Sequence, residues 1–147
     1  MKWTAADVEV FNQSKEYIDT VIIPILSVTG SRELKSTVSK GEFITQITQE
    51  LERQLTGRIF LYPPLTFIKS DDHIENRLIE WKKELENQFK HVLFLTSEEK
   101  LKEDKDKSVI WIPAVPLEHL SEKLKGNLFQ DQIEQILNIL LQYWSKS

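Results

Sequence analysis

Short hydrophobic runs alternate along this chain with longer segments in which hydrophobic residues recur at every third or fourth position. Four of the runs are expected to be strands, because they are short and rich in β-branched and aromatic residues. They cover residues 19–28, 58–62, 91–96 and 108–113. Capping residues and helical spacing predict helices that begin at Thr4, Ser39 and Asp72, then a short helix over 117–125 that Gly126 ends, and a last helix after it.

Strands that alternate with helices are typical of a largely parallel sheet. Right-handed crossovers then predict a four-stranded sheet in the order 2-1-3-4, with helices on both faces, as a single three-layer α/β domain over residues 1–147. One connection leaves an alternative open. The acidic and lysine-rich segment 97–107 is short for a parallel crossover, so strand 108–113 could instead run antiparallel at the edge of the sheet.

Proline interrupts three of the expected strands, at Pro24, Pro63 and Pro113. Because proline has no N–H to donate to a sheet, each of them is expected to mark the place where pairing stops or bulges. If these strands are parallel neighbours, the segments beyond the prolines gather at the carboxyl edge of the sheet, where α/β proteins usually bind ligands. The sequence therefore predicts that this edge carries the functional surface.

Basic and hydroxyl side chains gather in segment 27–40, which is expected to be a loop that leads into a helix. The amino end of that helix would favour a phosphate or carboxylate group. Dinucleotide-binding and phosphate-loop glycine patterns are absent from the chain. The plainer alternative is a surface loop whose serines cap the helix. The candidate anion-binding residues are Ser27, Thr29, Arg32, Lys35, Ser39 and Lys40.

An apolar lip is predicted where segments 63–68 and 114–117 leave the sheet. If both segments are loops at one edge, they form a hydrophobic surface for a partner protein or a second copy of the chain. The alternative is that residues 65–68 continue the strand and are buried, which a short apolar run does not decide. The candidate interface residues are Pro64, Leu65, Phe67, Ile68 and Val115.

Composition removes several classes of chemistry. The formal net charge of −4 argues against a nucleic-acid partner, which would require a basic stripe on the protein. Without cysteine there is no disulfide, thiolate nucleophile or cysteine metal site. The three histidines lie far apart, and no serine-hydrolase motif occurs, so we predict no metal site, no cofactor and no catalytic residues.

The apolar runs are too short for a transmembrane helix, and the first residues lack the hydrophobic core of a secretion signal. We therefore expect no membrane partner. The absence of cysteine is compatible with a reducing compartment, so a cytoplasmic location is expected.

The opening of the chain resembles the YpiF-like family of Bacillus-type bacteria, a family of unknown function. The resemblance rests on Met1-Lys2-Trp3, Asp7-Val8, Phe11, the run from Lys15 to Thr20, and Ile23-Pro24. It implies a small cytoplasmic bacterial protein and supplies no site residues. The residues themselves favour a non-enzymatic interaction or accessory protein that uses the carboxyl edge of the sheet, with binding of a small anion or nucleotide at loop 27–40 as the alternative.

Overall fold

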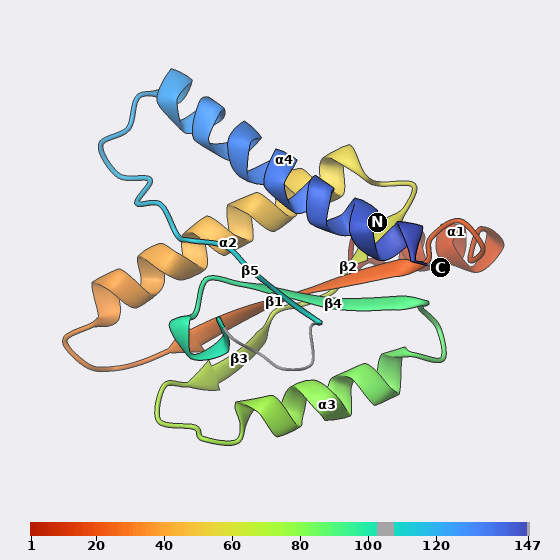
Figure 1. The fold of residues 1–147 in the computed structure, drawn as a ribbon, viewed down its shortest axis with the longest axis horizontal. Helices are drawn as coiled ribbons and strands as arrows, with labels where there is room; N and C mark the ends of the chain where they lie inside the picture. Colours follow the sequence, from red (N-terminus) through yellow and green to blue (C-terminus); the bar gives the residue numbers. More distant parts are fainter. Residues whose placement is uncertain (103–107, 147) are drawn as a thin grey trace.

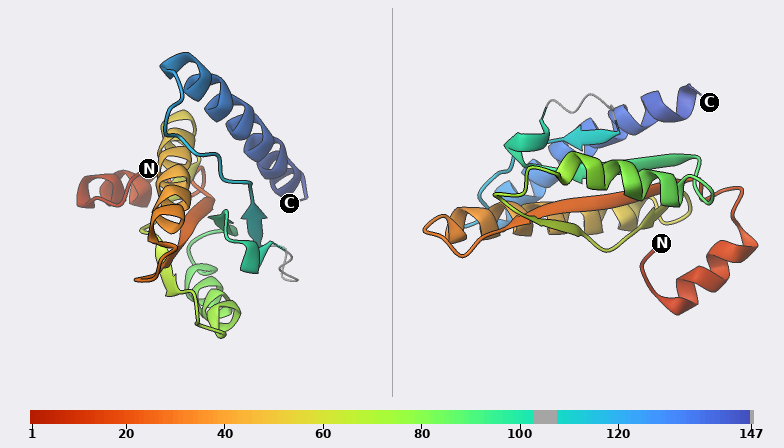
Figure 2. Two further views of the ribbon diagram at one scale, coloured as in Figure 1. Left: turned by 90° about the vertical axis from the view of Figure 1, so that its left-hand side faces the viewer. Right: turned by 90° about the horizontal axis from the view of Figure 1, so that it is seen from below.

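The computed structural model describes residues 1–102 and 108–146, which form three layers (Figure 1). The sheet lies between helices α2 and α4 on one face and helix α3 on the other (Figure 2). The predicted α/β class is thus confirmed. The elements in chain order are α1 (Ala5–Gln13), β1 (Thr20–Val28), α2 (Leu34–Gln54), β2 (Ile59–Leu61), β3 (Leu65–Ile68), α3 (Ile74–Leu85), β4 (His91–Thr96), the 3₁₀ helix η1 (Glu99–Leu101), β5 (Val109–Trp111) and α4 (Glu122–Ser145).

The sheet has the order β2-β1-β4-β5, and β3 also pairs with β1. Every strand pair in the described residues is parallel, so the antiparallel alternative for the strand after 97–107 is wrong. Residues 103–107 of that connection lie outside the described residues. The sheet has one strand more than predicted because residues 65–68 continue beside β1 as a further strand, which was the alternative to an apolar lip: β2 lies along the first half of β1 and β3 along the second half.

A bulge separates β2 from β3. Ile22 pairs with Leu61 and Ile25 pairs with Leu65, so an advance of three residues along β1 corresponds to an advance of four residues from β2 to β3. The additional residue falls at Pro63-Pro64, and two consecutive prolines cannot donate to the sheet there. Pairing therefore bulges at Pro63, as expected for a proline, but the prediction that this happens at the carboxyl edge is wrong, because β3 continues beside β1 after the bulge.

Pro24 also lies inside the sheet, paired with Leu95 of β4. The Tyr62 N–H donates to the Ile22 oxygen at 3.0 Å, so the backbone groups of Pro24, two residues further on, face the same side of the strand. The missing N–H of Pro24 therefore faces the bulge, where it is not needed. Of the three prolines expected to end strands together, Pro63 and Pro113 follow the ends of β2 and β5, but β2 ends halfway along β1.

Both faces of the sheet are buried, which is why the strands are nearly continuous hydrophobic runs. The face covered by α2 and α4 buries Ile22, Phe43, Ile44, Ile47, Leu51, Leu93, Leu95, Ile110, Ile133, Ile136 and Leu140. The opposite face, covered by α3 and the end of α1, buries Phe11, Val21, Ile23, Ile25, Phe60, Leu65, Phe67, Ile74, Leu78 and Phe94.

The boundaries of α2 and α4 differ most from the prediction. Helix α2 begins at Leu34 and not at Ser39, so the expected loop 27–40 is reduced to the turn after β1, residues 29–33. Helix α4 is continuous through Gly126, because this glycine does not adopt the positive φ that would end a helix. An interior glycine is tolerated in a helix at a cost of about 1 kcal/mol.

Candidate functional site

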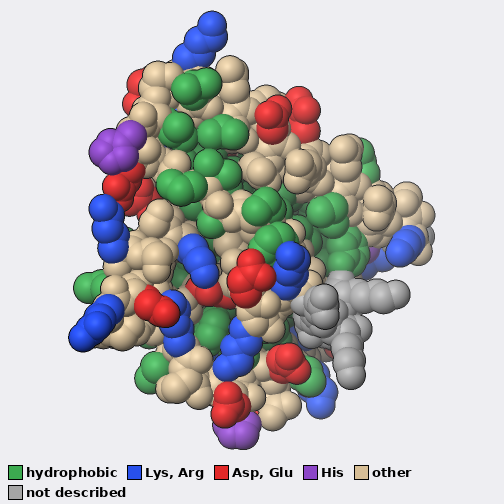
Figure 3. Space-filling view, turned by 60° about the vertical axis from the view of Figure 1, so that its left-hand side comes forward, with side chains coloured by type: hydrophobic (Ala, Val, Ile, Leu, Met, Phe, Trp, Pro, Cys, Tyr) green, Lys and Arg blue, Asp and Glu red, His purple; other side chains and the backbone are tan. Residues whose placement is uncertain are grey.

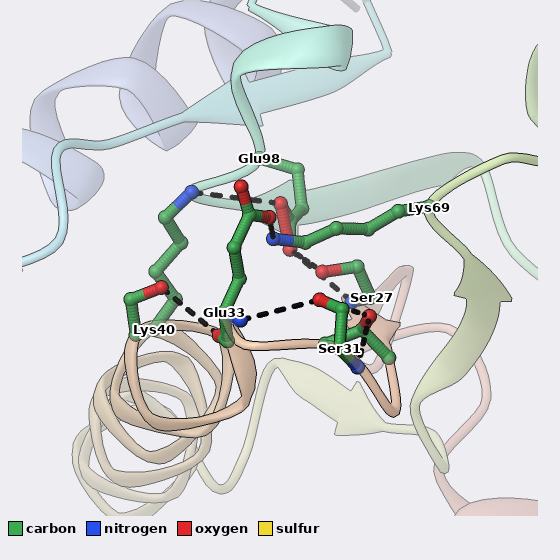
Figure 4. Close-up of polar contacts among 8 residues, drawn as sticks. Ser27, Ser31, Glu33, Lys40, Lys69 and Glu98 are labelled. Carbon is green, nitrogen blue, oxygen red and sulfur yellow. Dashed lines mark hydrogen bonds and ion pairs between the residues drawn. The ribbon is translucent and has the colours of Figure 1, made fainter.

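The carboxyl edge contains the topological switch point of the sheet. The chain leaves β1 towards β2 on one side and later crosses from β3 to β4 on the other. Parallel α/β sheets usually bind ligands outside the carboxyl ends of the strands at such a point. Here residues at the end of β1 and just beyond β3 and β4 form a small polar network with the first two turns of α2 (Figure 4).

Glu98 is the centre of this network and is only 7% exposed. Its carboxylate accepts hydrogen bonds from the Ser27 hydroxyl and from the Ser27 N–H, the latter at 3.2 Å. The Lys40 ammonium lies 3.9 Å from its other oxygen. Sequence reasoning missed Glu98, although its place two residues after the end of the buried strand β4 is a signal that could have identified it.

A second ion pair borders the first. The Lys69 ammonium lies 2.7 Å from the Glu33 carboxylate, and both side chains point into the same region as Lys40 (Figure 4). The hydrogen bond from Lys69 is the main reason that the pKa of Glu33 is below its ordinary value, and Lys40 contributes less. The lysines at this edge therefore already have acidic partners.

The structure brings together only part of the predicted anion-binding set. Ser27 and Lys40 meet at Glu98. Thr29 instead bonds within the turn to Ser31, and Lys35 lies 3.5 Å from Glu118 at the surface. Arg32 is exposed on the same turn, and Ser39 lies within α2. On the face that Figure 3 brings forward, lysine and arginine side chains are interspersed with acidic ones. Anion binding at this edge stays a prediction.

The predicted apolar lip is not formed. Leu65 is 1% exposed and Phe67 is 4% exposed, because β3 directs both side chains into the core on the α3 face. Pro64 and Ile68 are exposed beside them. Val115 follows β5 and packs partly against the core on the α2 and α4 face. Since β3 and β5 lie on opposite sides of β1, these residues do not make one continuous surface.

A cavity of about 1020 Å³ opens beside β2, away from the predicted site. One wall is polar and comes from successive turns of α2. The lining also includes Trp3, Tyr62 and Pro63. The lining residues are Lys2, Trp3, Gln46, Gln49, Glu50, Glu52, Arg53, Leu61, Tyr62, Pro63 and Phe129.

A second cavity of about 280 Å³ shares Trp3, Tyr62 and Pro63 with the first and adds Trp81 and Leu85 of α3. We call the three shared residues the aromatic ridge and the two cavities together the edge groove. The Trp3 and Tyr62 rings meet edge to face with centroids 4.5 Å apart. Trp3 nevertheless remains 58% exposed, which is a large apolar area in contact with solvent.

Buried contacts of Met1 hold the aromatic ridge in place. The Met1 ammonium donates to the Ile59 oxygen at 2.6 Å, and the Leu61 N–H donates to the Met1 oxygen at 2.8 Å, so residue 1 lies along the outer side of β2. The Glu52 carboxylate is 3.1 Å from the same ammonium. The exposed position of Trp3 depends on this pairing.

Burial of the Tyr62 ring raises the pKa of its hydroxyl.

The residues in 1–102 and 108–146 include no cluster of three or more histidine and carboxylate side chains that could hold a metal ion. In the same ranges, no helix combines the length and the apolar character needed to cross a bilayer.

A family model described as "Protein of unknown function (DUF2487)" matches residues 9–144. The chain belongs to the DUF2487 family. It is 39% identical over 146 residues to the uncharacterized protein YpiF of Bacillus subtilis (strain 168), and the match covers 99% of each chain. The resemblance of the first residues to this family is therefore confirmed and extends to nearly the whole sequence. No solved structure matches the chain.

Proposed function

We propose that this DUF2487 protein is a non-enzymatic interaction protein that binds an extended, proline-containing polypeptide segment in the edge groove. The observation that carries the proposal is the aromatic ridge, with Trp3 58% exposed between two cavities. Grooves lined by aromatic rings recognise proline-rich segments, because such segments are already extended and lose little entropy on binding.

The polar wall of the groove suits a peptide backbone. Gln46 and Gln49 lie three residues apart on α2 and contribute amide donors and acceptors to the same cavity lining as the aromatic ridge. The cavity of about 1020 Å³ is open to solvent. Its volume is at the upper limit of roughly 300–1,000 Å³ that is typical of small-molecule pockets, which favours a longer ligand. The proposed functional surface is therefore on the β2 side, whereas the sequence led us to expect it at the carboxyl edge.

A display library of random short peptides, selected on the immobilised protein, tests this proposal. Peptides that are enriched on the wild type should bind Trp3→Ala at least ten times more weakly. Tyr17→Ala is the matched control, because it removes an aromatic side chain that is 66% exposed and does not line the groove.

Trp3→Ala also removes a ring contact within the fold, so a second variant is needed. Gln49→Arg adds bulk at an exposed position of the polar wall and should weaken the same peptides while the circular dichroism spectrum remains unchanged. If no enriched peptide depends on Trp3 or on Gln49, the proposal is wrong.

A second candidate function is the binding of a small anion at the carboxyl edge. Two buried hydroxyls lie near this edge: Thr37 is in the first turn of α2, and Ser97 directly follows β4. Neither hydroxyl has a hydrogen-bond partner in the described residues. Ser27 and Lys40 already serve Glu98. An incoming phosphate or carboxylate would therefore have to take the place of the Glu98 side chain.

Thermal unfolding with phosphate and with nucleotides tests the second candidate. Glu98→Gln should be stabilised by these ligands more than the wild type, because the competing negative charge is gone. A ligand at a hundredfold excess over Kd stabilises by about 2.7 kcal/mol. Glu50→Gln, a change at an exposed ion pair of α2, is the control. If millimolar ligand raises the unfolding temperature of neither the wild type nor Glu98→Gln, this candidate function is wrong.

A further inference from the structure

The amino group of Met1 occupies a buried site in which, among the described residues, three oxygen atoms accept from it. The Met1 nitrogen lies 2.6 Å from the Ile59 oxygen, 3.3 Å from the Thr56 oxygen and 3.1 Å from the Glu52 carboxylate. Met1 is 6% exposed and Glu52 is 3% exposed. Figure 1 shows the amino terminus close to β2 and to the end of α2, which supply these oxygens. The site therefore combines two carbonyl groups with a buried negative charge.

Glu52 needs a positively charged partner for two reasons. A buried carboxylate without a counter-charge is strongly destabilising. Glu52 also lies in the last turn of α2, where the helix dipole favours cations over anions. The Thr56 hydroxyl donates to this carboxylate at 3.1 Å but brings no charge, and Arg53 is paired with Glu50 instead. The Met1 ammonium is thus the group that compensates the charge of Glu52.

An amide nitrogen in place of the ammonium would not satisfy this site. An ammonium carries a positive charge and three N–H donors, one for each of the surrounding oxygens. Acylation of an amino terminus removes the charge, and the resulting amide nitrogen keeps a single N–H. An acyl group on Met1 would therefore leave the Glu52 charge buried without compensation, and would leave fewer donors than acceptors.

The position of Met1 also determines the position of the aromatic ridge. The Leu61 N–H donates to the Met1 oxygen at 2.8 Å, and the Met1 side chain is buried in the core on the α3 face. Trp3 follows two residues later, and its ring meets Tyr62 and Phe60 edge to face at centroid distances of 4.5 Å and 6.2 Å. If Met1 leaves β2, Trp3 loses the anchor that holds its ring against Tyr62.

We propose that the α-amino group of Met1 is a modification site that controls formation of the edge groove. The groove forms when this amine is free, and an acyl group such as formyl or acetyl prevents Met1 from binding beside β2. This inference goes beyond the proposed function, because it concerns how the aromatic ridge is assembled, whichever ligand the groove binds.

Burial of the amine sets the order of events. Since the folded protein covers the nitrogen, an acyl group present on Met1 has to be removed before the chain folds. The class of reaction that supplies the free amine is amide hydrolysis. Water adds to the acyl carbon and the C–N bond breaks. The acid leaves as a carboxylate, and the nitrogen keeps the bonding electron pair and gains both water protons to become the ammonium.

Urea unfolding of the full-length protein tests this inference. Wild type and Glu52→Gln are each prepared with a free amine and with an acetylated amine. Acetylation should raise the unfolding equilibrium constant of the wild type by about a hundredfold or more, because it breaks a buried ion pair. Glu52→Gln should also raise this constant when the amine is free. When the amine is acetylated, Glu52→Gln should instead lower it, because no buried charge is then left unpaired.

Glu50→Gln is the matched control, since it changes an exposed ion pair on the same helix. It should have the same small effect with the free and with the acetylated amine. A Gly-Ser extension before Met1, which also turns the ammonium into an amide, should act like acetylation. The NMR signal of the Trp3 indole N–H, identified with Trp3→Phe, should move towards the position of a solvent-exposed indole in the acetylated and extended proteins.

Three outcomes would overturn the inference. The first is equal stability of the free and acetylated wild type. The second is a Glu52→Gln effect of the same sign and size in both forms. The third is that both acetylated proteins fail to fold, since the added bulk would then be the cause and the charge would not. Folding of acetylated Glu52→Gln but not of the acetylated wild type would support the inference. A peptide selection without Trp3-dependent binders would contradict the proposed function and leave this inference intact.

Discussion

At the scale of single residues, an ion pair, a cation–π contact and a partly buried histidine lie together at the amino edge of the sheet. Arg58 holds both carboxylate oxygens of Asp19 at 3.2 Å and lies 4.0 Å from the centre of the Trp144 ring. His91 lies beside this group, and its Nε2 is buried without a hydrogen-bond partner in the described residues. These contacts connect the beginnings of three strands to the end of α4.

We predict that His91 makes the protein less stable as the pH falls from 7.5 to 5.5. Burial is the main reason that the pKa of His91 is below its ordinary value, and the nearby Asp19 offsets part of the effect. A histidine with a lowered pKa in the folded state binds more protons when the chain unfolds, so stability is lost as the pH drops through the unfolded value of about 6.5. Urea unfolding at several pH values measures this loss.

His91→Gln should reduce the pH dependence over this range. His119→Gln is the matched control, because its side chain is 93% exposed, and it should leave the dependence as in the wild type. If His91→Gln and the wild type lose equal stability between pH 7.5 and 5.5, His91 is not the group responsible.

At the scale of elements, the bulge at Pro63-Pro64 sets which face of β3 is buried. Successive side chains of a strand point to opposite faces, so a shift of one residue exchanges the buried and exposed sets. Leu65 and Phe67 are buried while Thr66 and Ile68 are exposed. The additional residue at the bulge is therefore needed to bring Leu65 and Phe67 into the core.

Deletion of Pro64 should destabilise the protein by about 3 kcal/mol or more, because Leu65 and Phe67 would leave the core or the strand would lose its pairing. Pro64→Ala keeps the length of the chain and should cost about 1 kcal/mol or less. Urea unfolding compares the two variants. Equal losses would mean that the register of β3 does not depend on the bulge.

Gly126 gives a second prediction at this scale. Its backbone does not adopt positive φ, and an added Cβ would meet no atom within 4 Å. Gly126→Ala should therefore raise the free energy of unfolding by about 0.5–1 kcal/mol, as alanine does in a helix interior. If Gly126 ended a helix in the left-handed conformation, the same change would destabilise the protein, so thermal unfolding distinguishes one helix from two.

At the scale of the whole molecule, one sheet supports two separate cores. Phe43 lies in the core on the α2 and α4 face, and Phe94 lies in the core on the α3 face, both with 0% exposure. Because β1 and β4 contribute side chains to both cores, loss of either core is expected to weaken the other.

Phe43→Ala and Phe94→Ala should each lower the free energy of unfolding by about 3–5 kcal/mol. Both variants should still unfold in a single transition, with circular dichroism and tryptophan fluorescence coincident. Val10→Ala, at a residue of α1 that is 49% exposed, is the control and should change stability by about 0.5 kcal/mol or less. Separate transitions for the two faces would contradict this coupling.

Local sequence patterns predicted much of the fold correctly. The strand expected at 91–96 has the same bounds as β4, and Thr4 caps α1 by accepting a hydrogen bond from the Asp7 N–H at 3.1 Å. The parallel order around β1 also followed from the alternation of strands and helices. These features could be predicted because each depends on local signals in the sequence: hydrophobic spacing, a capping side chain, and the alternation of strand and helix patterns.

The tertiary structure alone decided where the candidate surfaces lie. Ser27 meets Glu98 across 71 residues, and the exposure of Trp3 depends on the pairing of Met1 with β2. The burial of Phe67 depends on the register that the bulge imposes on β3. A sequence states which side chains prefer to be buried, but the available core is created only when distant strands pair, so long-range register determines which of these residues remain at the surface.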